Sequence, residues 1–122
     1  MVNYKRWHLI GLELPYSVAS VGIRGEASGA ATEFRADVVA VAKRDLSAGE
    51  LLDGEGGYTV SGGLRPALLS VRNGYVPLGL AHQVKLIRSG VKDQAVSWDD
   101  IEIDPTTSAY RLRKEVEAGV AQ

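Results

Sequence analysis

The amino-acid sequence predicts a mainly β domain with short helices, including one helix towards each end of the chain. The segment 36–43 ("ADVVAVAK") is dense in valine and almost continuously apolar, which is typical of a buried strand. The segment 84–88 ("VKLIR") alternates apolar and basic residues, which is typical of a half-exposed strand. Apolar residues at helical spacing occur instead near the two ends. The 122 residues suffice for one domain with a single core.

The composition argues against several classes of function. The 14 Lys and Arg residues are balanced by 15 Asp and Glu, so the net charge of -1 provides no basic face for nucleic acid or an anionic membrane. The absence of cysteine excludes disulfides, thiolate metal ligands and cysteine nucleophiles, and 2 histidines are too few for a histidine-rich metal site. We therefore expect a cytoplasmic protein without a metal, a nucleic-acid partner or a membrane partner.

The first helix is predicted from the spacing of Leu14, Val18 and Val21. Pro15 suits the first turn of this helix, and Gly25 is a plausible end. Glu13 interrupts the apolar stretch before it, and no small-residue cleavage site follows. We therefore expect the opening stretch to belong to the fold rather than to a signal peptide. No apolar run approaches the ~20 residues that cross a bilayer.

The central segments read as short elements separated by turns. After the strand 36–43, the segment "DLSAGELL" is predicted to turn, with Asp45 and Ser47 bonding local backbone N–H groups and Gly49 at positive φ. The break "DGEGG" is followed by a possible short strand at "YTV". A short helix is predicted between Pro66 and Asn73-Gly74, with an apolar face of Leu68, Leu69 and Val71.

The last segments predict a capped turn and a terminal helix. Ser97 and Asp100 are spaced as a capping box, which opens a single helical turn. The stretch "TTSAYRLRKEVEAG" predicts a helix that Gly119 ends. The side predicted to dock carries Ala109, Leu112 and Val116. The side predicted to face outward carries Arg111, Arg113 and Lys114.

A small unit occurs twice in the chain. "KRDLSAGELL" (43–52) and "IRSGVKDQAV" (87–96) lie 44 positions apart, and each reads as a strand, a polar turn and an apolar return. Asp93 stands in the second copy where Gly49 stands in the first. Because aspartate reaches left-handed φ less readily than glycine, the second turn is predicted to differ.

The two copies together resemble a SAF domain, the family of sialic acid synthase, type III antifreeze protein and the flagellar P-ring assembly protein. The first family motif matches Lys43, Arg44, Asp45, Leu46, Gly49, Glu50 and Leu52, and the second matches Ser97, Trp98, Asp100 and Ile101. The resemblance implies a SAF-like β-clip core at 36–104, preceded by a helix and loop at 1–35 and followed by a helix at 105–122. The repeat would then be the two halves of the clip.

A resemblance over nearly the whole chain is more specific. The stretches 7–29, 37–67 and 76–104 are similar to the C-terminal region of homoserine-dehydrogenase-like NAD(P)-dependent oxidoreductases. That group includes deoxyxylulose-phosphate (DXP) reductoisomerase-like enzymes of isoprenoid precursor synthesis. The most specific part is "LDGEGGYTVSGGL" (52–64), which general SAF domains lack. Those enzymes carry a Rossmann domain, whereas no G-x-G-x-x-G motif lies between a strand and a helix here. The resemblance therefore implies a non-catalytic module whose partner, a Rossmann-type dehydrogenase domain or subunit, holds the NAD(P).

Candidate ligand-binding residues fall into three groups, with no catalytic or cofactor-binding residue among them. The candidates are Arg6, His8 and Glu13 near a seam with a catalytic domain, Lys43 and Arg44 with Arg88 around an anion, and His82 as an isolated histidine. Each also has a plain structural explanation, such as a solvated arginine at a strand end or a partly buried histidine. The glycine-rich stretch around "DGEGG" could approach a ligand or simply form tight turns.

Two further hypotheses remain open from the sequence. One is a stand-alone sugar-acid-binding or regulatory SAF module, as found beside sugar-acid dehydratases. The other is a purely structural or dimerising domain, so a homodimer is also expected.

Overall fold

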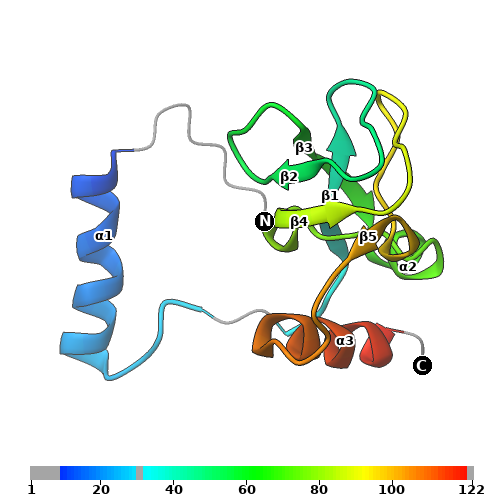
Figure 1. The fold of residues 1–122 in the computed structure, drawn as a ribbon. Helices are drawn as coiled ribbons and strands as arrows, with labels where there is room; N and C mark the ends of the chain where they lie inside the picture. Colours follow the sequence, from blue (N-terminus) through cyan, green and yellow to red (C-terminus); the bar gives the residue numbers. More distant parts are fainter. Residues whose placement is uncertain (1–8, 30–31, 121–122) are drawn as a thin grey trace. The chain divides into compact units, whose positions relative to one another are not determined.

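The computed structural model of the chain describes residues 9–29 and 32–120, in two separate units, one ending at Glu33 and the other beginning at Phe34. The first unit contains helix α1 (Ile10–Ala19), which continues as one π-helical turn over Ser20–Arg24 (Figure 1). Gly25 ends it at φ 65°, as the sequence predicts. None of the helices among the described residues has the length and apolar character needed to cross a membrane.

Pro15 lies inside α1 rather than in its first turn, so the predicted start of this helix is wrong. The helix begins five residues earlier, at Ile10. Proline has no N–H to donate to the carbonyl four residues before it, and its ring crowds that position. The residue four positions before Pro15 is Gly11, whose carbonyl therefore receives no hydrogen bond from position 15.

The second unit contains two small antiparallel sheets, which confirms the predicted mainly β fold with short helices. In one sheet β1 (Ala36–Ala42) pairs with β3 (Val60–Pro66). In the other, β4 (His82–Leu86) lies between β2 (Leu51–Asp53) and β5 (Ile101–Glu102) (Figure 1). The core is made of small and medium apolar side chains from both sheets and the turns between them: Ala40, Ala42, Leu46, Leu52, Val60, Val76, Ala81, Leu86, Val96 and Ile101.

Strand β3 is longer than the short strand predicted at 58–60, and it runs through two glycines. Because glycine lowers strand propensity, the sequence did not predict this strand at its full length. In the structure, side chains of the neighbouring strand occupy the space beside the two glycines. A Cβ on Gly62 would lie 2.8 Å from a Val38 methyl, and one on Gly63 would lie 2.6 Å from a Val41 methyl. Valine side chains of β1 therefore pack over the bare backbone of β3.

The hydrogen bonds between the two repeated turns show that the repeat is structural. The Gly49 N–H of the first turn donates to the Leu86 carbonyl at 2.7 Å. The Asp93 N–H of the second turn donates to the Ala42 carbonyl at 2.8 Å. The two donors, Gly49 and Asp93, are 44 positions apart in the sequence, and so are the two acceptors, Ala42 and Leu86. Each turn therefore bonds to the strand that precedes the other turn, as in a two-fold arrangement.

Two residues at equivalent positions meet near the centre of this arrangement. The Leu46 N–H donates to the Gly90 carbonyl at 2.8 Å, and the Gly90 N–H donates back to Leu46 at 3.0 Å. The turn residues Gly49 and Asp93 have φ of 89° and 66°. The prediction that the second turn differs is therefore wrong. Aspartate is one of the few non-glycine residues that visit left-handed φ, because its short polar side chain can bond locally.

Helix α2 (Ala67–Arg72) follows Pro66 directly, and Gly74 ends it at φ 62°, as predicted. Its buried residues, however, are Ala67 and Ser70. The predicted apolar face is wrong in part, because Leu68 and Leu69 are 57% and 44% exposed. Single 3-10 turns occupy Leu78–Leu80 and Trp98–Asp100, and the predicted capping box of Ser97 and Asp100 is present at the second.

Helix α3 (Ser108–Val120) packs through the side opposite to the one predicted. The Arg113 side chain is 10% exposed and donates to Asp37 of β1, from Nη1 to Oδ1 at 3.1 Å and from Nη2 to Oδ2 at 2.6 Å. Leu112 and Val116 remain 61% and 44% exposed. A buried carboxylate at Asp37 requires a paired cation, and this requirement outweighs the weak apolar stripe.

Aromatic rings complete the attachment of α3. The Lys114 ammonium lies 4.3 Å from the centre of the Trp98 ring, and Tyr110 meets the same ring edge-on at 5.4 Å. The Trp98 indole N–H donates to Glu117 at 3.3 Å, and the Arg113 guanidinium lies 5.0 Å from the Phe34 ring. The predicted outward side of α3 is thus wrong for Arg113 and Lys114, which dock, whereas Arg111 is exposed as predicted. Gly119 lies within the helix rather than ending it.

Candidate functional site

Three of the predicted ligand-binding residues surround β2 and the turn that follows it. Lys43 Nζ donates to the Gly57 carbonyl, Arg44 pairs with Glu50, and His82 Nδ1 lies 3.0 Å from the Asp53 carbonyl. The side chain of Arg88 is exposed at the equivalent position of the second half, and Glu13 lies in the other unit, on α1. The remaining candidates, Arg6 and His8, lie outside the described residues.

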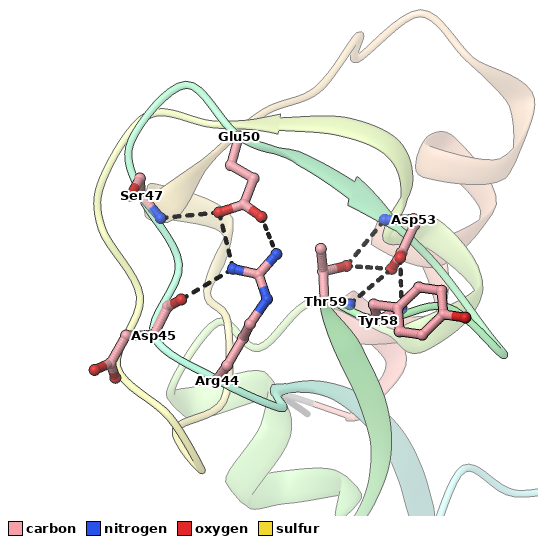
Figure 2. Close-up of polar contacts among 7 residues, drawn as sticks. All are labelled: Arg44, Asp45, Ser47, Glu50, Asp53, Tyr58 and Thr59. Atoms are coloured by element: carbon pink, nitrogen blue, oxygen red, sulfur yellow. Dashed lines mark hydrogen bonds and ion pairs between the residues drawn. The ribbon is translucent and has the colours of Figure 1, made fainter.

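The Arg44–Glu50 pair braces the first repeated turn (Figure 2). Both terminal nitrogens of Arg44 donate to the Glu50 carboxylate, and Nη1 also donates to the Asp45 carbonyl at 3.1 Å. The Ser47 N–H donates to Glu50 at 3.1 Å. Hydrogen bonds from Arg44 and then from Ser47 lower the pKa of Glu50. The guanidinium of Arg44 is therefore satisfied within the chain, and its geometry is that of a turn brace.

The second half lacks this pair, because Gln94 occupies the position equivalent to Glu50. Asp45 also bonds at long range rather than locally, since its carboxylate accepts the Lys92 N–H at 2.8 Å. This contact joins the two turns to each other. Of these charged side chains, Asp45 therefore joins the two halves, whereas Arg44 and Glu50 pair within the first turn. No contact among the described residues brings Arg88 to Arg44.

The glycine-rich stretch after β2 is a tightly built turn organised by Asp53 (Figure 2). The Asp53 carboxylate accepts the Tyr58 N–H, the Thr59 N–H at 3.0 Å and the Thr59 hydroxyl. The Thr59 hydroxyl and the Tyr58 N–H are the main causes that lower the pKa of Asp53 to about 2. A Cβ on Gly57 would lie 2.1 Å from the Asp53 carboxyl carbon, so only glycine fits there. The turn holds Tyr58 outward, with 86% of its surface exposed.

An open groove of about 680 Å³ lies beside β4, β5 and the start of α3. Gln83, at φ 55°, projects into it from a bulge in β4, where the register to β2 shifts. Glu102 and Asp104 make the groove negative, and hydrogen bonds from the Thr106 hydroxyl and N–H lower the pKa of Asp104. The groove is lined by Gly79, Leu80, His82, Gln83, Val84, Glu102, Ile103, Asp104, Thr107 and Ala109.

The charge of this groove disfavours anionic ligands such as sugar acids, because His82 is the single lining residue that can become positive. The groove could instead accept a neutral polyol or an amine. Within residues 9–29 and 32–120, no group of three or more histidine, aspartate or glutamate side chains is arranged to hold a metal ion.

Sequence reasoning missed the polar network under α3. Asp37 is 6% exposed and accepts Ser70 Oγ as well as Arg113, and Glu117 receives Arg113 Nε at 2.8 Å and Lys114 Nζ at 2.8 Å. One signal could have found it. An aspartate inside a valine-rich strand needs a cationic partner wherever that strand is buried.

Several exposed apolar residues lie on α1 and on the π-helical turn that continues it. Ile10, Leu14 and Val18 of α1 and Val21 of that turn are 80%, 63%, 65% and 60% exposed. Comparison with known protein families gives no matching family model, and comparison with curated proteins gives no match. The candidate sites among the described residues are therefore the groove beside β4 and the exposed apolar residues of the first unit.

Proposed function

We propose that this chain is a non-catalytic, SAF-like β-clip module that works with an NAD(P)-dependent oxidoreductase of the reductoisomerase-like type, either as a domain or as a subunit. The observation that carries the proposal is the exposed apolar surface of α1. The resemblance of residues 36–104 to SAF domains, and of the stretch 52–64 to the oxidoreductase tail, supplies the identity of the partner.

Helix α1 is mostly apolar. From Leu9 to Ile23 the only charged residue is Glu13, and the other polar side chains are Tyr16, Ser17 and Ser20. A helix with so few polar residues normally buries most of its surface. Full burial of one Val, Leu or Ile side chain contributes about 1.5–3 kcal/mol. Burial of the exposed apolar residues of α1 by a partner therefore provides enough free energy for a stable association, even after the cost of ordering.

The polar groups around β2 support a non-catalytic role. Lys43, Arg44 and Asp53 are each bonded to other groups of the chain, so they brace turns. The glycine-rich stretch 54–57 connects β2 to β3 and opens no helix. A Rossmann pyrophosphate site requires a helix N-terminus directly after its glycines. Hydride transfer would accordingly be the task of the partner.

The test uses the full chain as bait in lysate of its source organism, with Val18→Asp and Val91→Asp as matched variants. Val18 lies on α1 and Val91 in the second repeated turn, and they are 65% and 54% exposed. We expect the unchanged chain and Val91→Asp to retain a Rossmann-type dehydrogenase that lacks a SAF-like tail, and Val18→Asp to lose it. Mass spectrometry identifies the retained proteins.

Reconstitution then measures NADPH oxidation by the purified dehydrogenase with and without the chain. An increase that Val18→Asp does not produce supports the proposal. Recovery of no dehydrogenase by a well-folded bait, or equal binding by Val18→Asp, would overturn it.

A further inference from the structure

Strand β3 has one edge that faces away from its only partner strand. The Lys43 N–H donates to the Thr59 carbonyl at 2.9 Å, and the register continues without a shift to Pro66. Since hydrogen-bonded pairs alternate along an antiparallel ladder, the odd-numbered residues of β3 bond to β1. Gly62 and Leu64 therefore direct their backbone N–H and C=O groups away from β1.

This edge is unpaired within the part of the chain that the structure describes, because β3 is the end strand of a two-stranded sheet. One contact touches it: Arg65 Nη1 donates to the Leu64 carbonyl at 2.9 Å. In the other half of the repeat the corresponding strand, β5, has only 2 residues. Strand β3 has 7 residues, and its outward-directed groups at Gly62 and Leu64 are a template for another strand. Natural proteins normally shorten, charge or cover such an edge.

We propose that two copies of the chain pair through their β3 edges, in antiparallel register about Gly63. In that register Gly62 of one copy opposes Leu64 of the other, and their N–H and C=O groups form the new ladder. Gly63 faces its own symmetry mate as a non-hydrogen-bonded pair, which places Cα atoms about 4.5 Å apart. The sheets then join into one four-stranded sheet with the strand order β1, β3, β3, β1.

The side chains of this edge are complementary to themselves. Leu64 is 70% exposed, and its cross-strand neighbour on the same face, Val38, is 48% exposed. In the proposed register Leu64 lies beside the bare backbone of Gly62 in the other copy. Val38 and Leu78 already pack over that glycine, since a Cβ there would lie 2.8 Å and 3.2 Å from their methyl groups. Each copy thus inserts one leucine beside an apolar pair of the other.

A second copy fits this edge better than an unrelated extended peptide. Strand addition by a foreign peptide takes its specificity from side-chain pockets along the edge. Here the one such place that the structure shows is beside Gly62, where Leu64 of the second copy would lie, and Pro66 has no N–H to continue the ladder for a longer peptide. Pairing of two copies in the proposed register needs no hydrogen bond from Pro66. Gly62 and Leu64 of each copy bond to Leu64 and Gly62 of the other. This proposal is independent of the dehydrogenase partner.

The test measures self-association of the full chain by sedimentation equilibrium, with Leu64→Lys and the control Leu112→Lys. Leu112 is a comparably exposed leucine, on α3. We expect a monomer–dimer equilibrium in which Leu64→Lys weakens the dimer by roughly tenfold or more and Leu112→Lys does not. The measurements are repeated with Leu64→Lys and Leu112→Lys made in the Val18→Asp chain, in which association through α1 is prevented.

Amide hydrogen exchange by NMR identifies the interface. In the monomer the N–H groups of Ser61 and Gly63 are protected by β1, whereas those of Gly62 and Leu64 exchange freely. At concentrations that populate the dimer, we expect the Gly62 and Leu64 amides to become protected as well. A chain that stays monomeric, or a dimer that survives Leu64→Lys with these two amides unprotected, would overturn the proposal.

Discussion

The buried ion pair between Asp37 and Arg113 should be a main determinant of the stability of the β unit. The perturbation is Asp37→Asn, which removes the charge but keeps an oxygen that can accept Ser70 Oγ. The two charged side chains are 6% and 10% exposed, so little water is available to replace the lost partner. The variant therefore leaves a buried guanidinium with Glu117 as its only anionic partner.

The expected loss follows from this burial. Removing one partner of a buried ion pair costs about 3–5 kcal/mol. Because asparagine keeps an acceptor and Glu117 remains, we expect about 3 kcal/mol, the lower end of that range. For a domain of this size, 1 kcal/mol shifts the melting temperature by about 4–8 °C, so the expected decrease is about 12–24 °C. The total stability of such a domain is about 5–15 kcal/mol, so the change is readily measured.

Urea unfolding followed by Trp98 fluorescence measures this loss. The ring of Trp98 contacts Lys114 and Tyr110 of α3, so its emission reports the attachment of the helix. Trp7, the second tryptophan, is replaced by phenylalanine in every variant. Glu115→Gln, an exposed position of the same helix, is the control and should change stability by less than about 0.5 kcal/mol.

A double-mutant cycle of Asp37→Asn and Arg113→Met measures the interaction free energy between these two residues, apart from their contacts with other groups. We expect the double variant to be less destabilised than the two single variants added together, since neither charge is then left unpaired. A loss below about 1 kcal/mol for Asp37→Asn, together with additive effects, would refute the reasoning.

Three further predictions concern the turns. Because the pKa of Asp53 is lowered in the folded chain, the stabilisation that Asp53 contributes is present above its ordinary pKa of 3.8 and is lost as pH falls through about 2. The Tyr58 amide should therefore lose protection from hydrogen exchange in that pH window, while the core amides keep theirs. Gly57→Ala should break this turn, because the added Cβ would collide with Asp53. In Gly56→Ala the added Cβ meets no atom within 4 Å, so only the strain of a positive φ is added. Comparison of the unfolding midpoints of the two variants tests this difference. Asp93→Gly should stabilise the chain relative to Asp93→Ala by about 1–2 kcal/mol in urea unfolding, because φ there is 66°.

Each of these predictions has a clear contrary result. Protection of the Tyr58 amide that persists well below pH 2, where Asp53 is fully protonated, would mean that Asp53 does not organise the turn. Equal midpoints for the two glycine variants would contradict the close approach. An alanine at position 93 as stable as glycine would contradict the left-handed conformation.

Local rules predicted those parts of the fold that local chemistry decides. Gly25, Pro66 and Gly74 mark helix boundaries through their own backbone preferences, and these hold in the structure. The capping box of Ser97 and Asp100 involves residues three positions apart. In each case the information lies within one turn of chain, so a single sequence contains it.

The packing side of α3 could not be predicted in the same way. An apolar stripe shows where Leu112 and Val116 lie, but it does not show whether that side meets the domain. The decision comes from Asp37, 76 positions before Arg113. Likewise Gly62 and Gly63 reduce strand propensity locally, and only the valines of the neighbouring strand show why β3 forms. Tertiary contacts override propensity at both places.

The candidate surfaces were also only partly visible in the sequence. The spacing of Leu14, Val18 and Val21 predicted the first helix, but the open edge of β3 depends on which strand ends a sheet, and sheet order is a long-range property. Arg44 and Arg88 looked equivalent because the repeat makes their positions equivalent. Their environments nevertheless differ, since Glu50 of the first turn is replaced by Gln94 in the second.

The differences between the two halves show where function is to be sought. The halves share their backbone hydrogen bonds across the central turns, because both sets close the same core. They differ where the chain faces outward. The first half carries the Asp53 turn with Tyr58 at its surface and the long edge of β3, whereas the second carries the short capped turn before β5. A common fold needs only the shared part, so the outward features of the first half require another explanation. The open edge of β3 is where the proposed pairing of two copies would take place, on a strand held by its own register with β1.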